Sequence, residues 1–310
     1  MKRHAAIFVF ALVLGCALST TVGRAQSAAN TLQSKVSLRQ EAAAPDPLTS
    51  SDSDLGDIDV VQRFPKPETF TFSTSQQFFY TDNVFYTNTH EVGSTAYLGS
   101  YTASFVPYSL RDWTPRISLQ YNMARYGSAA SGDFDNENAA FSSQYVFSDD
   151  RQWSWTATVN ASRFTAPHSG DHEFYKEIVY DNQITHVNQV IKDFPLFFIA
   201  AYDLAYHQAN PSQFDRLDNT LSFSLAYYPI PEISIGPFVR PGVRIYFTDG
   251  NGQDDRHDFN LSEGIDVTWT PVKYFSMSAD FSRSDNYSNN SALSYGVSTP
   301  GVSVTGTLKF

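Results

Sequence analysis

Large apolar and small polar residues alternate along the chain from Glu68 to the last residue, Phe310. The segments 153–161 and 275–281 each turn aromatic or aliphatic side chains to one side and Ser, Thr, Asn or Asp to the other. A period of two places successive side chains on opposite faces of a strand. The pattern therefore predicts β-strands with one apolar face and one small, polar face.

Twelve such segments follow one another, and pattern reading locates their ends only to within about 2–4 residues. The predicted strands are 68–81, 93–106, 116–126, 138–148, 153–164, 177–187, 196–207, 219–228, 233–247, 258–270, 274–284 and 293–310.

The connections between these segments alternate in kind. One set is long, polar and rich in Gly, Asn and Asp, at 82–92, 127–137, 165–177, 208–219, 248–258 and 284–292. The other set is mostly short and often contains Pro, at 106–115, 148–152, 188–195, 228–232 and 270–274. Transmembrane β-barrels arrange their outer loops and periplasmic turns in this alternating way.

A soluble β-sandwich and a membrane barrel both produce apolar/polar alternation, with opposite faces turned to solvent. The polar face here is rich in Ser and Thr and poor in Lys and Glu, whereas a water-exposed sheet surface carries more charge. The tryptophans also lie near the short connections, where an interfacial aromatic girdle belongs. The sequence therefore predicts an all-β fold, an antiparallel up-and-down transmembrane β-barrel of twelve strands spanning 67–310, with interfacial aromatics Trp113, Trp153, Trp155 and Trp269.

The N-terminus has the layout of a secretory signal peptide. Lys2 and Arg3 precede an apolar run, and Gly23 and Ala25 supply small residues before a cleavage site at Gln26. We expect 1–25 to be removed. The alternatives are a membrane anchor, for which the run is short and lacks a charged stop, and a lipid-modified Cys16.

Residues 26–66 differ in texture from the barrel, because they are rich in Ala, Ser, Asp and Pro and hold a single aromatic, Phe64. Such composition is typical of a disordered or weakly helical periplasmic leader. A plug inside the barrel and a partner-binding tail are the functional alternatives for this segment.

Charge and cysteine usage narrow the possible partners. The chain has a net charge of −11, and loss of Lys2, Arg3 and Arg24 with the signal leaves −14, which argues against nucleic acid as a partner. The only cysteine is Cys16, so the mature chain would have no disulfide to stabilise it.

Ionisable residues on the polar face are candidates for solute selection. In 233–247, the alternation turns Arg240 and Arg244 away from the apolar side chains. Opposed to acids on other strands, they would set a transverse field across the lumen. The alternative is that they pair and fill a narrow barrel, since twelve strands lie between side-chain-filled and wide-pore sizes. The opposed acids are Asp181, Asp203, Asp266 and Asp280.

Enzymatic and metal readings have less support, and we predict no catalytic residue, metal or cofactor. The run 168–173 places His168, Asp171, His172 and Glu173 close together, as a metal site or a hydrolase with a neighbouring Ser would need. A hydrated surface loop explains the same composition. The acidic run 248–258 lacks the glycine position and the final Glu of a calcium loop.

The closing segment "VSVTGTLKF" resembles the β-signal of bacterial outer-membrane proteins, with Gly306 in place of a usual larger residue. The resemblance implies a place in the Gram-negative outer membrane and, as partners, the barrel-assembly machinery, periplasmic chaperones and the lipid bilayer. The signal would comprise Val302, Val304, Leu308 and Phe310.

A second stretch, "QFFYTDNVFYTNT" at 77–89, resembles the first hairpin of putative β-barrel porins, some associated with exopolysaccharide systems. The sequence thus favours a passive, porin-like channel for small solutes. A structural or secretion-associated barrel and an outer-membrane hydrolase are the alternatives.

Overall fold

The computed structural model describes residues 69–110, 112–147, 152–169, 172–192, 194–247 and 256–310. The predicted signal peptide 1–25 and leader 26–66 lie outside these residues, as does most of the acidic run 248–258. No helix within the described residues is long and apolar enough to cross a membrane.

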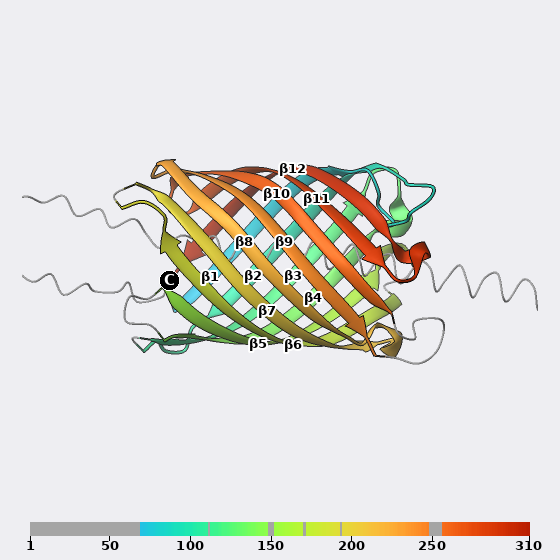
Figure 1. Ribbon diagram of the computed structural model, residues 1–310, viewed down its shortest axis with the longest axis horizontal. Helices are drawn as coiled ribbons and strands as arrows, with labels where there is room; N and C mark the ends of the chain where they lie inside the picture. The colour runs from blue at the N-terminus through green and yellow to red at the C-terminus, as the bar shows by residue number, and fades with distance from the viewer. Residues whose placement is uncertain (1–68, 111, 148–151, 170–171, 193, 248–255) are drawn as a thin grey trace, which may run out of the picture.

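Twelve antiparallel strands close into one barrel, which confirms the predicted fold (Figure 1). Each strand pairs with its neighbours in sequence, and the last pairs with the first through a continuous register from Thr71↔Lys309 to Phe79↔Gly301. Closure leaves no sheet edge unpaired. The strands are β1 (Phe70–Thr81), β2 (Ser94–Phe105), β3 (Trp113–Tyr126), β4 (Phe134–Val146), β5 (Trp153–Ala166), β6 (His172–Gln189), β7 (Leu196–Asn210), β8 (Arg216–Ile230), β9 (Ile233–Tyr246), β10 (His257–Val272), β11 (Phe275–Ser288) and β12 (Tyr295–Lys309).

The two ends of the barrel carry different connections. We call the end with connections 82–93, 127–133, 167–171, 211–215, 247–256 and 289–294 the loop end, and the end with 106–112, 147–152, 190–195, 231–232 and 273–274 the turn end. Residue 310 lies at the turn end, on the left of Figure 1. Short 3₁₀ turns lie at the loop end: η1 (Ala130–Gly132), η2 (Pro167–Ser169), η3 (Ser212–Phe214) and η4 (Ser291–Leu293).

Several strands run further towards the loop end than the alternation predicted. The predicted strand 177–187 is β6, which begins at His172, and the predicted loop 165–177 shrinks to 167–171. The physical reason lies on the outer face, where Glu173 and Lys176 replace the apolar residues found lower on the same strand. With polar side chains on the outer face and Tyr175 on the inner face, the apolar-out, polar-in alternation that marks a strand disappears from the sequence. The expected contrast between long and short connections is weaker for the same reason.

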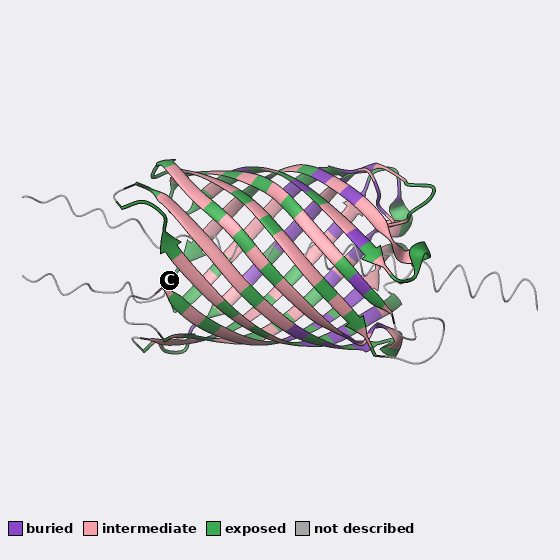
Figure 2. Ribbon diagram, viewed as in Figure 1, coloured by how far each residue is buried: buried purple, intermediate pink, exposed green. Residues whose placement is uncertain are grey.

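Exposure alternates along each strand, and buried residues gather towards the loop end (Figure 2). Most of the exposed positions along the barrel wall are large and apolar, such as Leu119, Phe141, Leu221 and Ile265. The large apolar side chains therefore point outward, and the small polar side chains line the interior. This arrangement is the reverse of a soluble sheet protein and matches a surface that meets lipid.

Candidate functional site

All six residues predicted to select solutes lie on the inner face of the barrel. On β9 the outward neighbours Val239, Val243 and Ile245 are exposed, whereas Arg240 and Arg244 are only partly accessible. The same alternation turns the four acids inward on four other strands. Asp181 lies on β6, Asp203 on β7, Asp266 on β10 and Asp280 on β11.

Two of these acids are direct neighbours across the β10–β11 ladder, because Asp266 and Asp280 are register partners. The side-chain amide of Gln77 on β1 donates to Asp280 Oδ1 at 3.3 Å. Gly236 on β9 leaves room for Asp266, since a Cβ at that position would lie 2.7 Å from Asp266 Oδ1. Two carboxylates with close polar neighbours thus lie on the inner face of β10 and β11.

Arg244 meets an acid that the sequence analysis did not select. Its Nε lies 3.5 Å from Asp218 Oδ2 on the adjacent strand β8. The predicted acids belong to other strands, so Arg244 pairs with a lateral neighbour on β8. Arg240 lies with its guanidinium carbon 5.7 Å from the ring of Phe238, two residues away on the same face of β9.

Asp218 belongs to a buried ionic network near the loop end. Arg216 Nε donates to Asp218 Oδ1 at 3.1 Å, and the Arg216 side chain is 1% exposed. His207 Nδ1 lies 2.9 Å from Glu177 Oε2, and His207 Nε2 lies 3.4 Å from Asp218 Oδ2. The hydroxyl of Tyr175 donates to Glu177 at 2.7 Å. Three strands, β6 to β8, are therefore joined by charge-assisted contacts inside the barrel.

A second group of ionic contacts lies further along the inner wall, at the loop end of β10 and β11. Arg256 Nη2 donates to the buried carboxylate of Asp258 at 2.6 Å, and the Asn286 amide donates to the same carboxylate at 3.3 Å. The guanidinium of Arg256 also covers the ring of Tyr246 at 4.1 Å. The inner wall from β6 to β11 thus carries ionic contacts in its loop-end half.

The inner wall from β12 through β1 to β5 has a different chemistry. Hydroxyl and amide side chains pair across it, as in Gln120 to Ser100 at 3.0 Å and Asn138 to Ser162 at 3.2 Å. Within the described strand residues of this wall, the alternation turns only two charged side chains inward, Arg116 and Lys309. Both lie near the turn end. We call β6–β11 the charged wall and β12–β5 the amide-hydroxyl wall.

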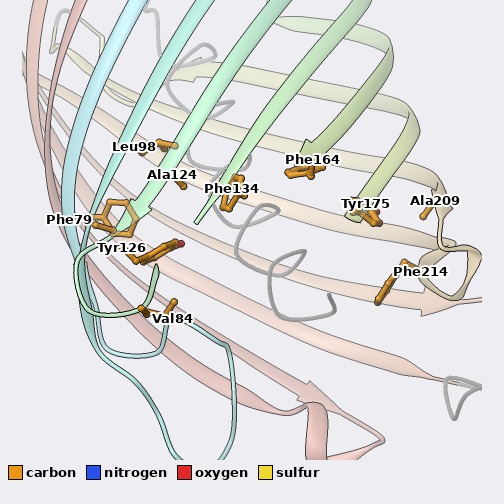
Figure 3. Packing of buried hydrophobic residues seen from close by; sticks show 12 residues of the cluster. Phe79, Val84, Leu98, Ala124, Tyr126, Phe134, Phe164, Tyr175, Ala209 and Phe214 are labelled. Carbon is orange, nitrogen blue, oxygen red and sulfur yellow. The ribbon is translucent and has the colours of Figure 1, made fainter. Parts of the chain in front are cut away.

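An apolar cluster covers the loop end of the inner face from β1 to β7 (Figure 3). Phe134 and Phe164 lie with ring centroids 5.8 Å apart, and Tyr175 contacts both Phe164 and Phe214. Tyr175 therefore belongs to the cluster through its ring and to the ionic network through its hydroxyl. The other members are Phe79, Val84, Ala96, Leu98, Ala124, Tyr126, Ala129 and Ala209.

The interfacial tryptophans occupy the turn end, where the alternation of connections placed them. Trp153, Trp155 and Trp269 point outward and are 40–47% exposed, and Trp113 Nε1 donates to Ser143 Oγ at 2.6 Å. Outward aromatic pairs stand nearer the loop end, with Tyr180 stacked on Tyr206 and Phe259 stacked on Tyr287. Aromatic residues therefore flank the apolar band on both sides, the arrangement that membrane barrels use at the two interfaces.

The residues of the closing segment also face outward. Val302, Val304, Leu308 and Phe310 are all exposed, and the backbone N–H of Phe310 donates to the carbonyl of Phe70 at 2.8 Å. The segment thus forms the seam with β1. A Cβ at Gly306 would lie 3.7 Å from Thr74, an ordinary contact, so the position has room for a Cβ atom.

The run 168–173 was the alternative metal or hydrolase site, and its His168 contacts a residue of another loop instead. His168 Nε2 lies 2.7 Å from Asp133 Oδ2 in a different loop, and Asp171 lies outside the described residues. Within the residues that the structure describes, no group of three or more His, Cys, Asp or Glu side chains could hold a metal ion.

Comparison with known proteins supports the fold without assigning a family. No family model and no curated protein matches the sequence. Among solved structures, the chain is similar to an outer-membrane channel from Pseudomonas putida F1, with a TM-score of 0.54, 13% identity, and coverage of 81% of this chain and 99% of that chain.

Two porins resemble the barrel more loosely. One is the KdgM porin in complex with disordered oligogalacturonate, with a TM-score of 0.43, 8% identity, and coverage of 76% of this chain and 98% of that chain. The other is the NanC porin, with a TM-score of 0.43, 10% identity, and coverage of 76% and 100%.

Proposed function

We propose that this protein is an outer-membrane channel through which small hydrophilic solutes diffuse passively. The observation that carries the proposal is the inner face, which is polar along most of the barrel while the outer face is apolar. A closed barrel of this kind is one of the two backbone arrangements that span a bilayer, and a polar interior is what a water-filled lumen needs. The turn end would face the periplasm and the loop end the exterior.

The charged wall makes the two sides of the lumen chemically different. Arginines and carboxylates are separated from the uncharged amide and hydroxyl groups on the opposite side, so a solute in transit meets different chemistry on its two sides. Such an arrangement orients dipolar solutes and discriminates between ions by sign. Arg240 is the inward cation through which we propose to test that discrimination.

Planar-bilayer conductance of the purified, folded protein tests the channel. Discrete conductance steps that depend on protein addition are the expected result. Heat-dependent gel mobility must show the folded barrel in the same preparation. Silent bilayers with folded protein would remove the channel proposal and leave a structural or secretion-associated barrel.

An outer-membrane hydrolase has weaker structural support. A catalytic histidine needs a ring nitrogen available to a nucleophile. In His207, the inward histidine of the ionic network, one ring nitrogen contacts Glu177 and the other lies near Asp218, with Arg216 beside both. The geometry favours a role in holding strands together.

We propose further that the closing segment is recognised during membrane assembly by the barrel-assembly machinery, after periplasmic chaperones have delivered the chain. The terminal aromatic side chain of Phe310 stands at the seam, 69% exposed. Deletion of Phe310 should reduce the folded fraction in outer membranes while export to the periplasm continues. Phe275→Ala, an outward aromatic residue at the same end, is the matched control. Equal losses for both variants would remove the signal role.

A further inference from the structure

Two polar side chains lie in the middle of the apolar outer face of β1. From the turn end to the loop end, the outward positions of this strand are Phe70, Phe72, Thr74, Gln76, Phe78 and Tyr80. The four aromatic residues of this series are 38–59% exposed. If the barrel spans a bilayer, Thr74 and Gln76 therefore lie at the depth of the hydrocarbon, with aromatic residues on both sides.

The two polar residues belong to a short hydrogen-bonded chain that begins on β2. The hydroxyl of Tyr97 donates to Gln76 Oε1, and Gln76 Nε2 donates to Thr74 Oγ1 at 2.8 Å. The register partner of Gln76 on β2 is Gly99. Tyr97 lies across this glycine, since a Cβ at Gly99 would be 2.8 Å from the Tyr97 hydroxyl oxygen. The missing side chain at position 99 thus permits the contact between Tyr97 and Gln76.

This chain of bonds leaves two donors over. A carboxamide has two N–H donors and a hydroxyl has one O–H donor. Within the residues that the structure describes, the side chain of Gln76 donates only to Thr74, and the Thr74 hydroxyl only accepts. One N–H of Gln76 and the O–H of Thr74 therefore lack an acceptor. Acyl chains supply none, and an unsatisfied polar group in hydrocarbon is strongly unfavourable.

The surface beside these donors is low on the β12 side. Thr74 pairs with Gly306, and Gln76 pairs with Val304. The atom nearest to a Cβ at Gly306 would belong to Thr74, at 3.7 Å, so the space over this glycine is open. A glycine within a strand often marks a place where another backbone approaches closely. A second sheet can therefore come near the Thr74 hydroxyl from this side.

From this arrangement we propose that the outer face around Gln76 binds the same face of a second copy of the chain, in a symmetric dimer. A carboxamide is complementary in charge to another carboxamide, because it has a positive N–H end and a negative oxygen with two lone pairs. The left-over N–H of each Gln76 donates to the carboxamide oxygen of the other copy. Polar side chains hold membrane-embedded segments together in this way.

Membrane insertion favours this self-pairing. A closed dimer of barrels inserted in the same direction has its two-fold axis along the membrane normal. That axis places each residue opposite its own copy at the same depth, so Gln76 meets Gln76. The contact is on the outer face, so the proposal does not depend on whether the barrel conducts.

Cross-linking in liposomes tests the contact. The only cysteine of the chain is Cys16, in the predicted signal peptide, so one introduced cysteine in the full mature chain reports on one position. Phe78→Cys, the next outward position after Gln76, should give covalent dimers with a short bismaleimide. Leu221→Cys, exposed on β8, should give none. Equal cross-linking of the two folded variants, or none at Phe78→Cys, would overturn the proposal.

Sedimentation equilibrium in density-matched micelles tests the polar side chains themselves. Gln76→Leu, Thr74→Val and Tyr97→Phe together replace the hydrogen-bonded chain with apolar groups of similar size and leave no hydroxyl of the chain unpaired. This triple variant should raise the Kd of the dimer about tenfold. Heat-dependent gel mobility must show that the variant barrel is folded. An unchanged Kd in the folded triple variant would show that these side chains do not form the contact.

A matched control lies elsewhere on the outer face. Asn182 is an exposed outward amide on β6, distant from β1 in the barrel. Asn182→Leu also removes a polar group from the outer face and should leave the Kd of the dimer unchanged. If it weakens the dimer as much as the triple variant does, the dimer uses another face and the proposal is wrong.

Discussion

The two walls of the barrel interior share one backbone architecture and differ in chemistry. The charged wall, β6–β11, holds Arg216, Asp218 and their partners in contacts of about 3 Å. The amide-hydroxyl wall, β12–β5, holds neutral pairs such as Asn122 and Asn136 at 3.0 Å. Both walls satisfy polar groups, the first mainly with ionic side chains and the second mainly with neutral ones. The difference indicates that the alternation determines which face a side chain occupies but leaves its charge undetermined.

The largest effect is expected from removing the most buried cation of the charged wall. Arg216→Met leaves Glu177 and Asp218 inside the barrel without their central partner. Breaking a buried ionic group by deleting one member costs about 3–5 kcal/mol. Urea unfolding in lipid vesicles should show a loss of that size. Partial rescue by adding Asp218→Asn would identify the unpaired carboxylate as the cause, and a loss below about 1 kcal/mol would show that the network adds no more than a neutral hydrogen bond.

Two tyrosines of the apolar cluster, one from each wall, allow the walls to be compared. They differ in the hydrogen bond that the hydroxyl of Tyr175 donates to a carboxylate. Tyr175 donates its hydroxyl to Glu177, whereas Tyr126 packs its ring edge-on against Phe79 and uses its backbone N–H to bond Asp133. Tyr175→Phe should cost about 1.5–3 kcal/mol, because it removes a hydrogen bond to a charged group. Tyr126→Phe should cost clearly less in the same unfolding measurement. Similar losses for the two variants would mean that the hydrogen bond from Tyr175 to the charged Glu177 adds no stability of its own.

The sequence predicted the strand count, the closure of β12 on β1 and the inward direction of Arg240, Arg244 and the four acids. These features depend only on a period of two, which survives wherever one face meets an apolar environment and the other a polar one. The direction of a side chain follows from its parity within the strand. The role of these residues in selecting solutes stays a prediction.

The ionic network was missed because two of its members, Arg216 and Asp218, lie outside the predicted strands, while Glu177 and His207 are the end residues of the predicted strands 177–187 and 196–207. The predicted strand 219–228 begins after Arg216 and Asp218, and the predicted strand 177–187 begins at Glu177 itself. Near the loop end the outer face becomes polar, so the contrast that marks a strand vanishes. The partner of Arg244 could not be predicted either. The register between neighbouring strands determines which side chains meet, and the pattern of a single strand contains no information on register.

A smaller and functional effect is expected from Arg240→Gln. A unit charge acts on an ion about 4 Å away with about 1 kcal/mol in water, which corresponds to a few-fold change in relative permeability. The reversal potential under a salt gradient should shift towards cations. Arg283→Gln removes an arginine from the outer face and should leave the reversal potential unchanged. An unaltered potential in Arg240→Gln would exclude this arginine from ion selection.

The smallest effect is expected on the amide-hydroxyl wall. Asn138→Ala removes the 3.2 Å bond to Ser162 Oγ, a neutral contact that contributes about 0.5–1.5 kcal/mol. Stability in the unfolding assay should fall within that range, and the reversal potential should not move, because no charge has been removed. A shift as large as that of Arg240→Gln would mean that pore shape, which both walls determine, dominates ion selection. The contrast between the walls would then concern stability alone.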